Sequence, residues 1–208
     1  MLLVIRVGDR GQAMEALSYL KSVMDSYHEL SNDCWGELQQ ALRIKSFKKG
    51  TVLVNFGDIP TKFYFVYKGL VRAYSMGQDE AAKEVNKNFF DEGRFPSAVV
   101  ATLDRTPSEI CIETLEDSTL VEIDHTKYRE LLEKYEDLKW YHIKYLEKHW
   151  VKEKEPVEIS LLDGEAKERY LSFIAENPLL AKRVPLYHLA SKLGITPTQL
   201  SRIRKTIN

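Results

Sequence analysis

The sequence predicts an α+β protein in three parts: an N-terminal jelly-roll β-barrel, a long helix and a C-terminal helix-turn-helix. Short β-rich runs separated by Gly, Asp and Pro occupy residues 44–124, which is typical of a sandwich or barrel. Helical periodicity returns at residue 125, and residues 186–208 carry the spacing of two crossing helices. We therefore divide the chain into residues 1–130, 131–162 and 163–208.

The last segment, LYHLASKLGITPTQLSRIRKTIN, has the residue spacing of a helix-turn-helix. Ala190 is small enough to let two helices cross closely, and Gly194 can take the positive φ of the tight turn between them. Leu200 and Ile203 follow at positions that pack the second helix onto the first. The opposite face of that helix is then free for the major groove of DNA.

The residues before this segment predict the remaining elements. Residues 12–43 are expected to form two helices, with Ser31-Asn32-Asp33 separating them and capping the second. Strands are predicted at residues 51–54, 63–66, 70–75, 83–90, 109–115 and 119–123. Turns are expected at Lys68-Gly69 and at residues 76–79, and a short helix at residues 97–103.

The helix after the barrel carries two apolar stripes. One comprises Leu131, Tyr135, Leu138, His142, Tyr145 and His149, and the other comprises Leu132, Lys139, Ile143, Leu146 and Trp150. Two stripes predict two partners, the barrel and a second copy of the chain, although both stripes could instead face the same chain. Pro156 predicts a kink or break near residues 152–156, and Asp163 is placed to cap the next helix.

The net charge of −1 conceals an uneven distribution. Residues 165–208 hold eight Lys or Arg and three acids, a net charge of +5, which leaves −6 for residues 1–164. A basic end on an acidic body fits DNA contact confined to that end. No apolar run reaches the length of a membrane helix and no signal peptide is recognisable, so we expect a cytoplasmic protein with no membrane contact. Its two cysteines, Cys34 and Cys111, are then reduced and structural.

Together these parts resemble a Crp/Fnr-type transcription regulator over approximately residues 30–208. Residues 49–58 resemble the entry turns of that family, residues 63–72 (FYFVYKGLVR) resemble its hairpin, and residues 90–95 (FDEGRF) resemble the approach to its ligand cassette. The resemblance implies a bacterial homodimer, joined through the helix at residues 131–155. It also implies binding to an inverted repeat in double-stranded DNA, with RNA polymerase as a further partner.

The resemblance also implies a cyclic-nucleotide site, but this chain departs from it. The family's cassette typically reads F-G-E-L and then R-S/T/A-A, in which the Glu holds the ribose and the Arg holds the phosphate. Here Phe95-Pro96-Ser97-Ala98 and Ser108-Glu109 stand at those places. A phosphate needs charge-assisted donors and is repelled by a carboxylate. The candidate pocket residues Phe95, Ser97, Ala98, Ser108 and Glu109 therefore predict that cyclic AMP is not the effector.

Other ligands remain open at this point. Arg105 or Arg94 could replace the missing guanidinium, and the small apolar cassette could accept another small molecule. Haem could be held by His125, His142 or His149, but a single histidine on a helix is more often structural than a ligand. We therefore predict no cofactor.

The second helix of the helix-turn-helix offers six candidate DNA contacts. Its buried face is expected to hold Leu200, Ile203 and Ile207. Arg202 then points outward, and its fork suits the two acceptors of a guanine edge. Further base readers are Thr198 and Gln199, and phosphate contacts are expected from Thr196, Ser201 and Lys205. Thr196 is also a good N-cap, with Pro197 in the first turn.

The sequence carries no catalytic motif. It lacks a G-x-S-x-G setting for its serines, a phosphate-binding glycine loop and a metal-ligand spacing of His and Glu. We therefore expect no enzyme. The alternative function is a ligand-binding or protein-interaction module that responds to a small molecule without sequence-specific DNA binding.

Overall fold

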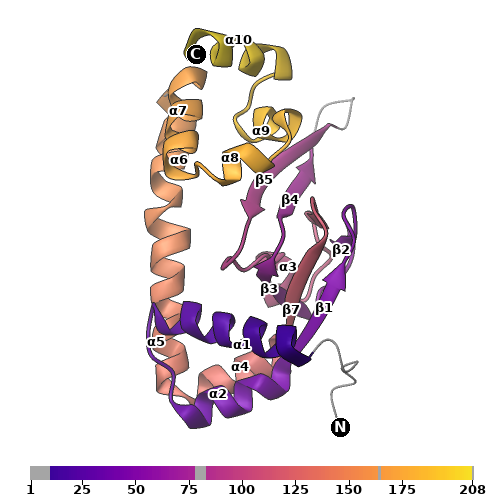
Figure 1. Ribbon diagram of the computed structural model, residues 1–208, viewed down its shortest axis with the longest axis vertical. Helices are drawn as coiled ribbons and strands as arrows, with labels where there is room; N and C mark the ends of the chain where they lie inside the picture. The colour runs from indigo at the N-terminus through magenta and orange to yellow at the C-terminus, as the bar shows by residue number, and fades with distance from the viewer. Residues whose placement is uncertain (1–9, 78–82, 164, 208) are drawn as a thin grey trace.

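Two β-sheets and a long helical arm, formed by residues 136–163, lie side by side (Figure 1). The computed structural model describes residues 10–77, 83–163 and 165–207. Helices from the N-terminal part join the sheets to the arm at one end. The C-terminal helices continue from the arm at the other end and contact the sheets again. The arm is therefore linked to the sheets by the chain itself at one end and by packing of the C-terminal helices at the other.

The β-rich segment forms two antiparallel sheets that share one core. The first has the order β1–β7–β3, and its strands span Leu42–Phe47, Ser118–Asp124 and Lys62–Lys68. The second has the order β2–β6–β4–β5, and its strands span Val52–Val54, Cys111–Thr114, Val71–Met76 and Glu84–Phe90. In the first sheet Val121 of β7 lies opposite both Ile44 and Phe65. The predicted barrel fold is confirmed, and the β1 strand is an addition to the predicted strands.

The N-terminal helices are shorter than predicted. Helix α1 spans Arg10–Asp25, α2 spans Asn32–Leu38, and a 3₁₀ turn at Gln39–Ala41 (η1) ends the helical segment. Ser31 caps α2 as expected, because its Oγ accepts a hydrogen bond from the Cys34 backbone N–H at 3.3 Å. The predicted helix to residue 43 is wrong, since Leu42 already begins β1 and pairs with Ile123.

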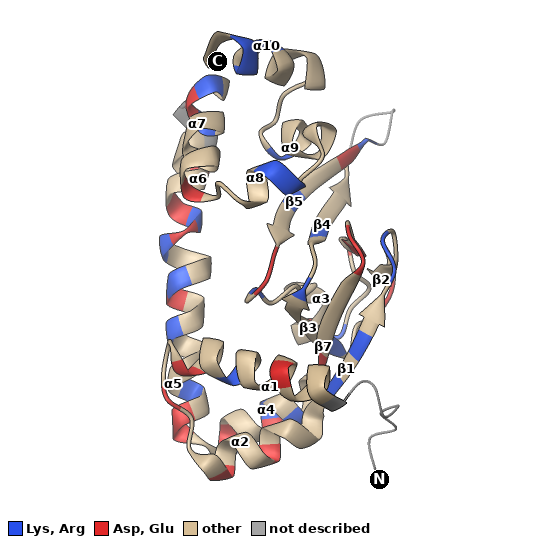
Figure 2. Ribbon diagram, viewed as in Figure 1, with Lys and Arg blue, Asp and Glu red and all other residues tan. Residues whose placement is uncertain are grey.

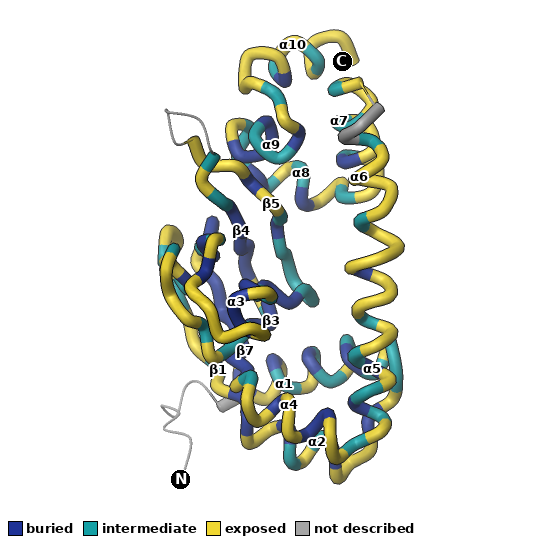
Figure 3. Tube along the Cα trace, turned by 180° about the vertical axis from the view of Figure 1, so that it is seen from behind, coloured by how far each residue is buried: buried dark blue, intermediate teal, exposed yellow. Residues whose placement is uncertain are grey.

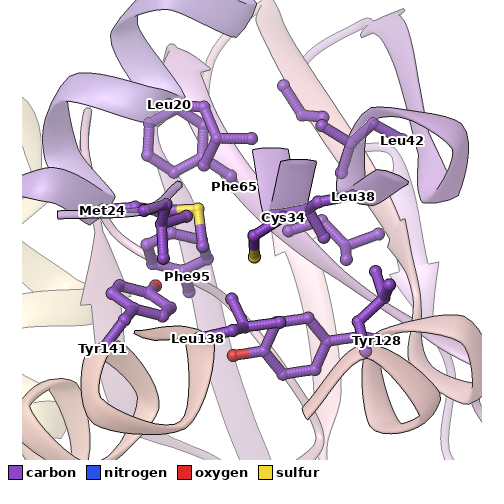
Figure 4. Close-up of a cluster of buried hydrophobic side chains, with 14 of the residues drawn as sticks. Leu20, Met24, Cys34, Leu38, Leu42, Phe65, Phe95, Tyr128, Leu138 and Tyr141 are labelled. Atoms are coloured by element: carbon purple, nitrogen blue, oxygen red, sulfur yellow. The ribbon is translucent and has the colours of Figure 1, made fainter. Parts of the chain in front are cut away.

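These helices cover the open face of the first sheet and complete the main core. Figure 4 shows Cys34 pointing among Leu20, Met24, Leu138 and Tyr141. Burial, with a smaller contribution from Asp137, raises the pKa of the Cys34 thiol to about 12. Cys111 is buried as well, and burial raises its pKa. Both thiols are therefore protonated at neutral pH, which fits a structural role.

The predicted long helix is interrupted twice. Helix α4 spans His125–Lys134 and ends at Tyr135, whose extended backbone (φ −113°, ψ 118°) separates it from α5 at Glu136–Leu146. A π-helical segment at Glu147–Lys152 (η2) follows, and the Glu153 N–H donates to the Lys148 carbonyl, five residues back, at 3.0 Å. Helix α6 then spans Lys154–Asp163.

Pro156 lies in the first turn of α6, which follows the π-helical segment directly. The irregularity predicted near residues 152–156 therefore begins earlier, at residues 147–153. The part of the stripe prediction that concerns the barrel is confirmed, since Leu131, Leu138 and His149 of the first stripe are buried. No described helix is long and apolar enough to cross a lipid bilayer.

The described residues 165–207 form four helices: α7 at Ala166–Glu176, α8 at Leu180–Arg183, α9 at Leu186–Lys192 and α10 at Pro197–Ile207. The expected cap at Asp163 is wrong, because that residue still belongs to α6 and Glu165 takes the N-cap position. The Glu165 N–H donates to the Glu168 side chain at 3.3 Å. A second turn expected at residues 76–79 falls in part outside the described residues.

A second apolar core joins the C-terminal helices to the barrel. Phe173, Leu180 and Leu200 from the helices form one buried cluster with Leu70 and Phe89 from the sheet side. Figure 3 shows buried backbone in α9, which lies beside β5, while α10 and most of the arm are exposed. The C-terminal helices are therefore docked on the barrel rather than suspended from the arm alone.

Candidate nucleic-acid interface and sensor site

The turn between α9 and α10 has the geometry that its sequence predicts. Ala190 is fully buried where the two helices cross, and Gly194 has a φ of +68°. The Ile195 N–H donates to the Ala190 carbonyl at 3.0 Å and closes the turn. Leu200 of α10 is also fully buried and anchors that helix to the cluster below it. The described residues 186–207 thus form a helix-turn-helix.

Thr196 and Gln199 cap the start of α10 reciprocally. The Gln199 N–H donates to Thr196 Oγ1 at 3.2 Å, and the Thr196 N–H donates to Gln199 Oε1 at 2.8 Å. Thr196 Oγ1 also lies 3.0 Å from the same amide oxygen. Two predicted DNA contacts are therefore occupied in holding the first turn, so the amide oxygen of Gln199 is not free for a base.

The outer face of α10 carries the remaining candidates. Thr198, Arg202 and Lys205 are exposed, and Ser201 is half-buried. Figure 2 shows basic residues on α10, whose sequence contains no acid. The predicted buried face is only partly correct: Ile203 is half-buried, but Ile207 is 37% exposed because α10 extends past the helices beneath it. Arg204 is exposed as well.

A buried polar network fixes α9 to β4 and β5. The guanidinium of Arg72 binds Glu113 and Glu84 at 2.6 Å each, and its Nη1 lies 3.0 Å from Nδ1 of His188. Burial, and next the Arg72 charge, lower the pKa of His188 to about 4, so His188 is neutral and accepts this hydrogen bond. Nearby, Ser191 Oγ accepts from the Asn86 N–H at 3.0 Å.

Arg183 makes a second clasp between the C-terminal helices and the barrel. Its guanidinium binds Glu92 at 2.6 Å and Glu116 at 2.8 Å. Lys192 turns inward too, and its Nζ donates to the Lys87 carbonyl at 3.1 Å. Two of the basic residues behind the +5 charge of residues 165–208, Arg183 and Lys192, therefore bind the barrel and do not face solvent where DNA would bind. The sequence analysis missed this network, because its partners lie far apart in the chain.

The predicted pocket residues do not come together. Ser108 is buried, and its Oγ donates to the Ile110 carbonyl at 2.7 Å, whereas Glu109 is exposed. Ala98 packs inside the barrel with Val71, Ile112 and other members of its core. Phe95 and Ser97 lie instead on a separate cavity, described below. Of the five predicted pocket residues, only Phe95 and Ser97 line this cavity together.

The barrel interior next to the cassette is filled by the protein's own side chains. Tyr64 is 2% exposed and lies in the core between the two sheets, together with Val66 and Leu120. Its hydroxyl donates to the Leu53 carbonyl at 3.2 Å. The cassette helix α3 spans Val99–Asp104 and turns Ala98 and Ala101 toward this core.

Neither substitute arginine faces that interior. Arg94 binds Glu153 at 2.9 Å, where the arm passes the barrel. Arg105 is exposed at the end of α3 with a φ of +54°. Burial would raise the pKa of Glu153, but contacts with His149 and Arg94 lower it to about 2. Arg94 is thus the partner of a permanent anion at the π-helical segment, and it is not available for a phosphate in the barrel.

A cavity of about 150 Å³ lies on the other side of α3, between that helix and helices α4 and α5. Its wall is largely aromatic and aliphatic, with Phe63, Phe95, Tyr141 and Trp150 among its members. Its basic side chains are His125, Arg129 and His142. None of the lining residues, all within the described part of the chain, is an acid.

Two of the three histidines considered for haem, His142 and His149, are engaged with protein groups. His142 Nδ1 lies 3.1 Å from the Tyr128 hydroxyl, and His149 Nε2 lies 2.6 Å from the Tyr27 hydroxyl. His149 Nδ1 lies 2.8 Å from Glu153. The described residues include no group of three or more His, Cys, Asp or Glu side chains that could hold a metal ion.

Comparisons with known proteins agree with this architecture. The family described as "Cyclic nucleotide-binding domain" matches residues 44–135. A CooA variant from Carboxydothermus hydrogenoformans has a TM-score of 0.66 and 18% identity, covering 90% of this chain and 83% of its own. FixK2 from Bradyrhizobium japonicum gives 0.65 and 16%, covering 80% and 84%. The catabolite activator protein of Thermus thermophilus gives 0.54 and 17%, covering 87% and 85%.

No curated protein matches the chain by sequence. The structural matches nevertheless extend over the barrel, the arm and the C-terminal helices, and so support the three-part fold as a whole. The strands, the cassette helix and α4 account for the residues that the family matches. Residues 44–135 therefore match the cyclic nucleotide-binding domain family, and the chain shares its fold with regulators of the Crp/Fnr family.

Proposed function

We propose that this protein is a dimeric DNA-binding transcription regulator whose barrel senses a ligand other than cyclic AMP. The observation that carries the proposal is α10 itself. It is capped at its start, anchored by one fully buried leucine, free of acids, and exposed along the face that holds Arg202. A helix held in this way can enter a major groove without unfolding any packed part of the molecule.

The contacts divide into two kinds. Arg202 is the principal base reader, because it is exposed and its fork matches two acceptors on guanine. Thr198 is the second base reader. Lys205 and Ser201 contact phosphates together with the first turn of α10, which Thr196 and Gln199 hold in place. The inward-facing Arg183 and Lys192 are left out of this set.

Dimerisation would supply a second α10 helix for DNA binding. Among the described residues of the arm, seven large apolar side chains are exposed: Trp140, Ile143, Leu146, Trp150, Val151, Val157 and Ile159. Three of them belong to the second predicted stripe, and the described part of the same chain leaves them uncovered. A second copy packed along this stripe would bury them and place two α10 helices on one operator with two-fold symmetry.

The case against cyclic AMP rests on the barrel. A cyclic nucleotide needs space between the sheets and a cation for its phosphate, but Tyr64 fills the interior and Arg94 is paired with Glu153. Glu109 and Ser108 supply no replacement cation.

Arg202→Ala tests the DNA assignment, with Arg204→Ala as the matched control. Each change removes one exposed arginine from α10, so both lower the general attraction to DNA equally. Arg202 lies about 200° around the helix from buried Leu200, whereas Arg204 lies about 40° from it. Operator fragments isolated from genomic DNA would be titrated against each protein by fluorescence anisotropy at several salt concentrations.

We expect Arg202→Ala to weaken specific binding at least tenfold, since one bidentate base contact contributes about 1–3 kcal/mol. Arg204→Ala should cost less and should preserve the preference for the operator over random DNA. Binding to the operator by the unaltered protein should weaken steeply as salt rises. Equal effects of the two substitutions would contradict the base-reader assignment. Binding that is absent, or insensitive to salt, would favour the alternative of an interaction module without specific DNA recognition.

A further inference from the structure

The cavity beside α3 is separate from the space in which the family's cassette holds its nucleotide. Helix α3 has two faces: Ala98 and Ala101 pack into the barrel core, while Val99, Thr102 and Leu103 line the cavity. The opposite wall comes from α4 and α5, and Trp150 of the π-helical segment completes it. One ligand in this space would therefore touch the cassette helix and the start of the arm together.

The size and lining of the cavity define what fits. Its volume of about 150 Å³ is similar to that of an engineered apolar cavity that holds one benzene ring. Phe63, Phe95 and Tyr141 offer aromatic faces and edges to such a ring. A nucleotide or a larger cofactor would need much more space than this.

The charges at the rim define the second feature of the ligand. The exposed guanidinium of Arg129 lines the cavity and has no hydrogen-bond or ion-pair partner among the described residues. His125 and His142 stand beside it, and burial, followed by the charge of Arg129, lowers the pKa of both. Asp124 opposes this effect at His125 by raising its pKa; it also accepts a bond from the Lys127 N–H at 2.9 Å and caps α4. An anion at this rim would meet hydrogen-bond donors and an uncompensated positive charge.

We propose that this cavity binds a small aromatic carboxylate, with its ring between Phe63, Phe95 and Tyr141 and its carboxylate at Arg129. The inference rests on the proposed sensor function, and it names the ligand class and the place where the ligand acts. Trp150 lies between the cavity and Lys154, whose Nζ stands 4.0 Å from the centre of the indole ring. A bound ring would thus contact the π-helical segment that leads to the helix-turn-helix.

Benzoate is the probe, benzamide is its uncharged counterpart, and cyclic AMP is the comparison nucleotide. Calorimetric titration of the full chain should show benzoate binding with at least tenfold higher affinity than benzamide, because only the carboxylate gains the charge-assisted bond. Cyclic AMP should not bind. Arg129→Gln should weaken benzoate binding about tenfold while leaving benzamide binding unchanged. Lys127→Gln removes the same charge from α4 outside the cavity and serves as the control.

Four results would overturn the proposal: no benzoate binding up to about 10 mM, equal binding of benzoate and benzamide, equal effects of Arg129→Gln and Lys127→Gln, or cyclic AMP binding in competition with benzoate. Circular dichroism of each variant verifies that it is folded. Operator binding is measured separately without benzoate. Loss of the ligand result with intact operator binding rejects only the ligand class, whereas benzoate binding without operator binding rejects the regulator function.

Discussion

Acidification should loosen the contact between the helix-turn-helix and the barrel through His188. This histidine is 4% exposed, and its Nδ1 faces the Arg72 guanidinium at 3.0 Å. Protonation would set two cations against each other inside a buried network, with Glu84 and Glu113 already bound to Arg72. The neutral form of His188 is therefore the form that holds the two parts together.

The size of the effect follows from the two pKa values of His188. Folding lowers its pKa from an ordinary 6.5 to about 4, so the folded state binds this proton less readily than the unfolded state. The stabilisation is fully present above pH 6.5 and is lost as the pH falls toward 4. Over the whole window the loss is about 3 kcal/mol, and about 2 kcal/mol is already lost at pH 5.

His188→Asn isolates this contribution. The asparagine amide oxygen can accept the Arg72 bond in place of Nδ1, but it does not titrate. Urea unfolding of both proteins at pH 8 and pH 5, followed by circular dichroism, gives the two free energies of unfolding. The natural chain should lose about 2 kcal/mol more than the variant on acidification. An equal loss in both proteins would refute the reasoning and assign the acid sensitivity to other groups.

Two further predictions concern the barrel corner and the dimer. Gly69→Ala should cost about 3 kcal/mol or more, because φ is +116° and the new Cβ would lie 2.7 Å from the Ser118 Cα. Gly57→Ala is the control: its φ is +84° but the space around it is open, so it should cost about 1–2 kcal/mol. Thermal denaturation of both variants measures the two costs, and equal costs would contradict the steric argument. Ile143→Glu should yield a folded monomer in analytical ultracentrifugation, because it charges a 41% exposed position of the proposed interface. Lys152→Glu should remain dimeric, and dimers of both variants would place the interface elsewhere.

The sequence predicted best those features that depend on residues close together in the chain. The turn at Gly194 and the crossing at Ala190 are encoded within a few residues, so their spacing alone was sufficient. The hairpin corner at Gly69 is a similar case. Strand β1 was missed because LRIKSF follows a helix directly, without the Gly or Pro that marks other boundaries. Its pairing with β7 lies about eighty residues away in the chain and overrides the helical pattern.

The candidate site was harder to predict, because it depends on contacts between distant segments. Arg72 and His188 are 116 residues apart, and neither belongs to a motif that points to the other. The expected nucleotide pocket was assembled from sequence positions, but Tyr64 from a different strand fills the interior beside them. The two apolar stripes were only partly separable, because Leu132 of the second stripe joins Leu131 and Leu138 in the main core. The DNA contacts and the dimer remain predictions.

The attachment of the arm to the barrel at both ends limits which changes in the arm the fold can accept. The arm is connected to the barrel at both ends. At one end it packs on the barrel, and beyond the other end Arg183 forms ion pairs with Glu92 and Glu116 of the same barrel. Both connections form at only one combination of arm length and twist. Removing one residue from a helix shortens it by about 1.5 Å and rotates everything beyond it by about 100°. Substitutions along the arm should therefore be tolerated far better than single-residue insertions or deletions, which would leave the clasp facing away from its carboxylates.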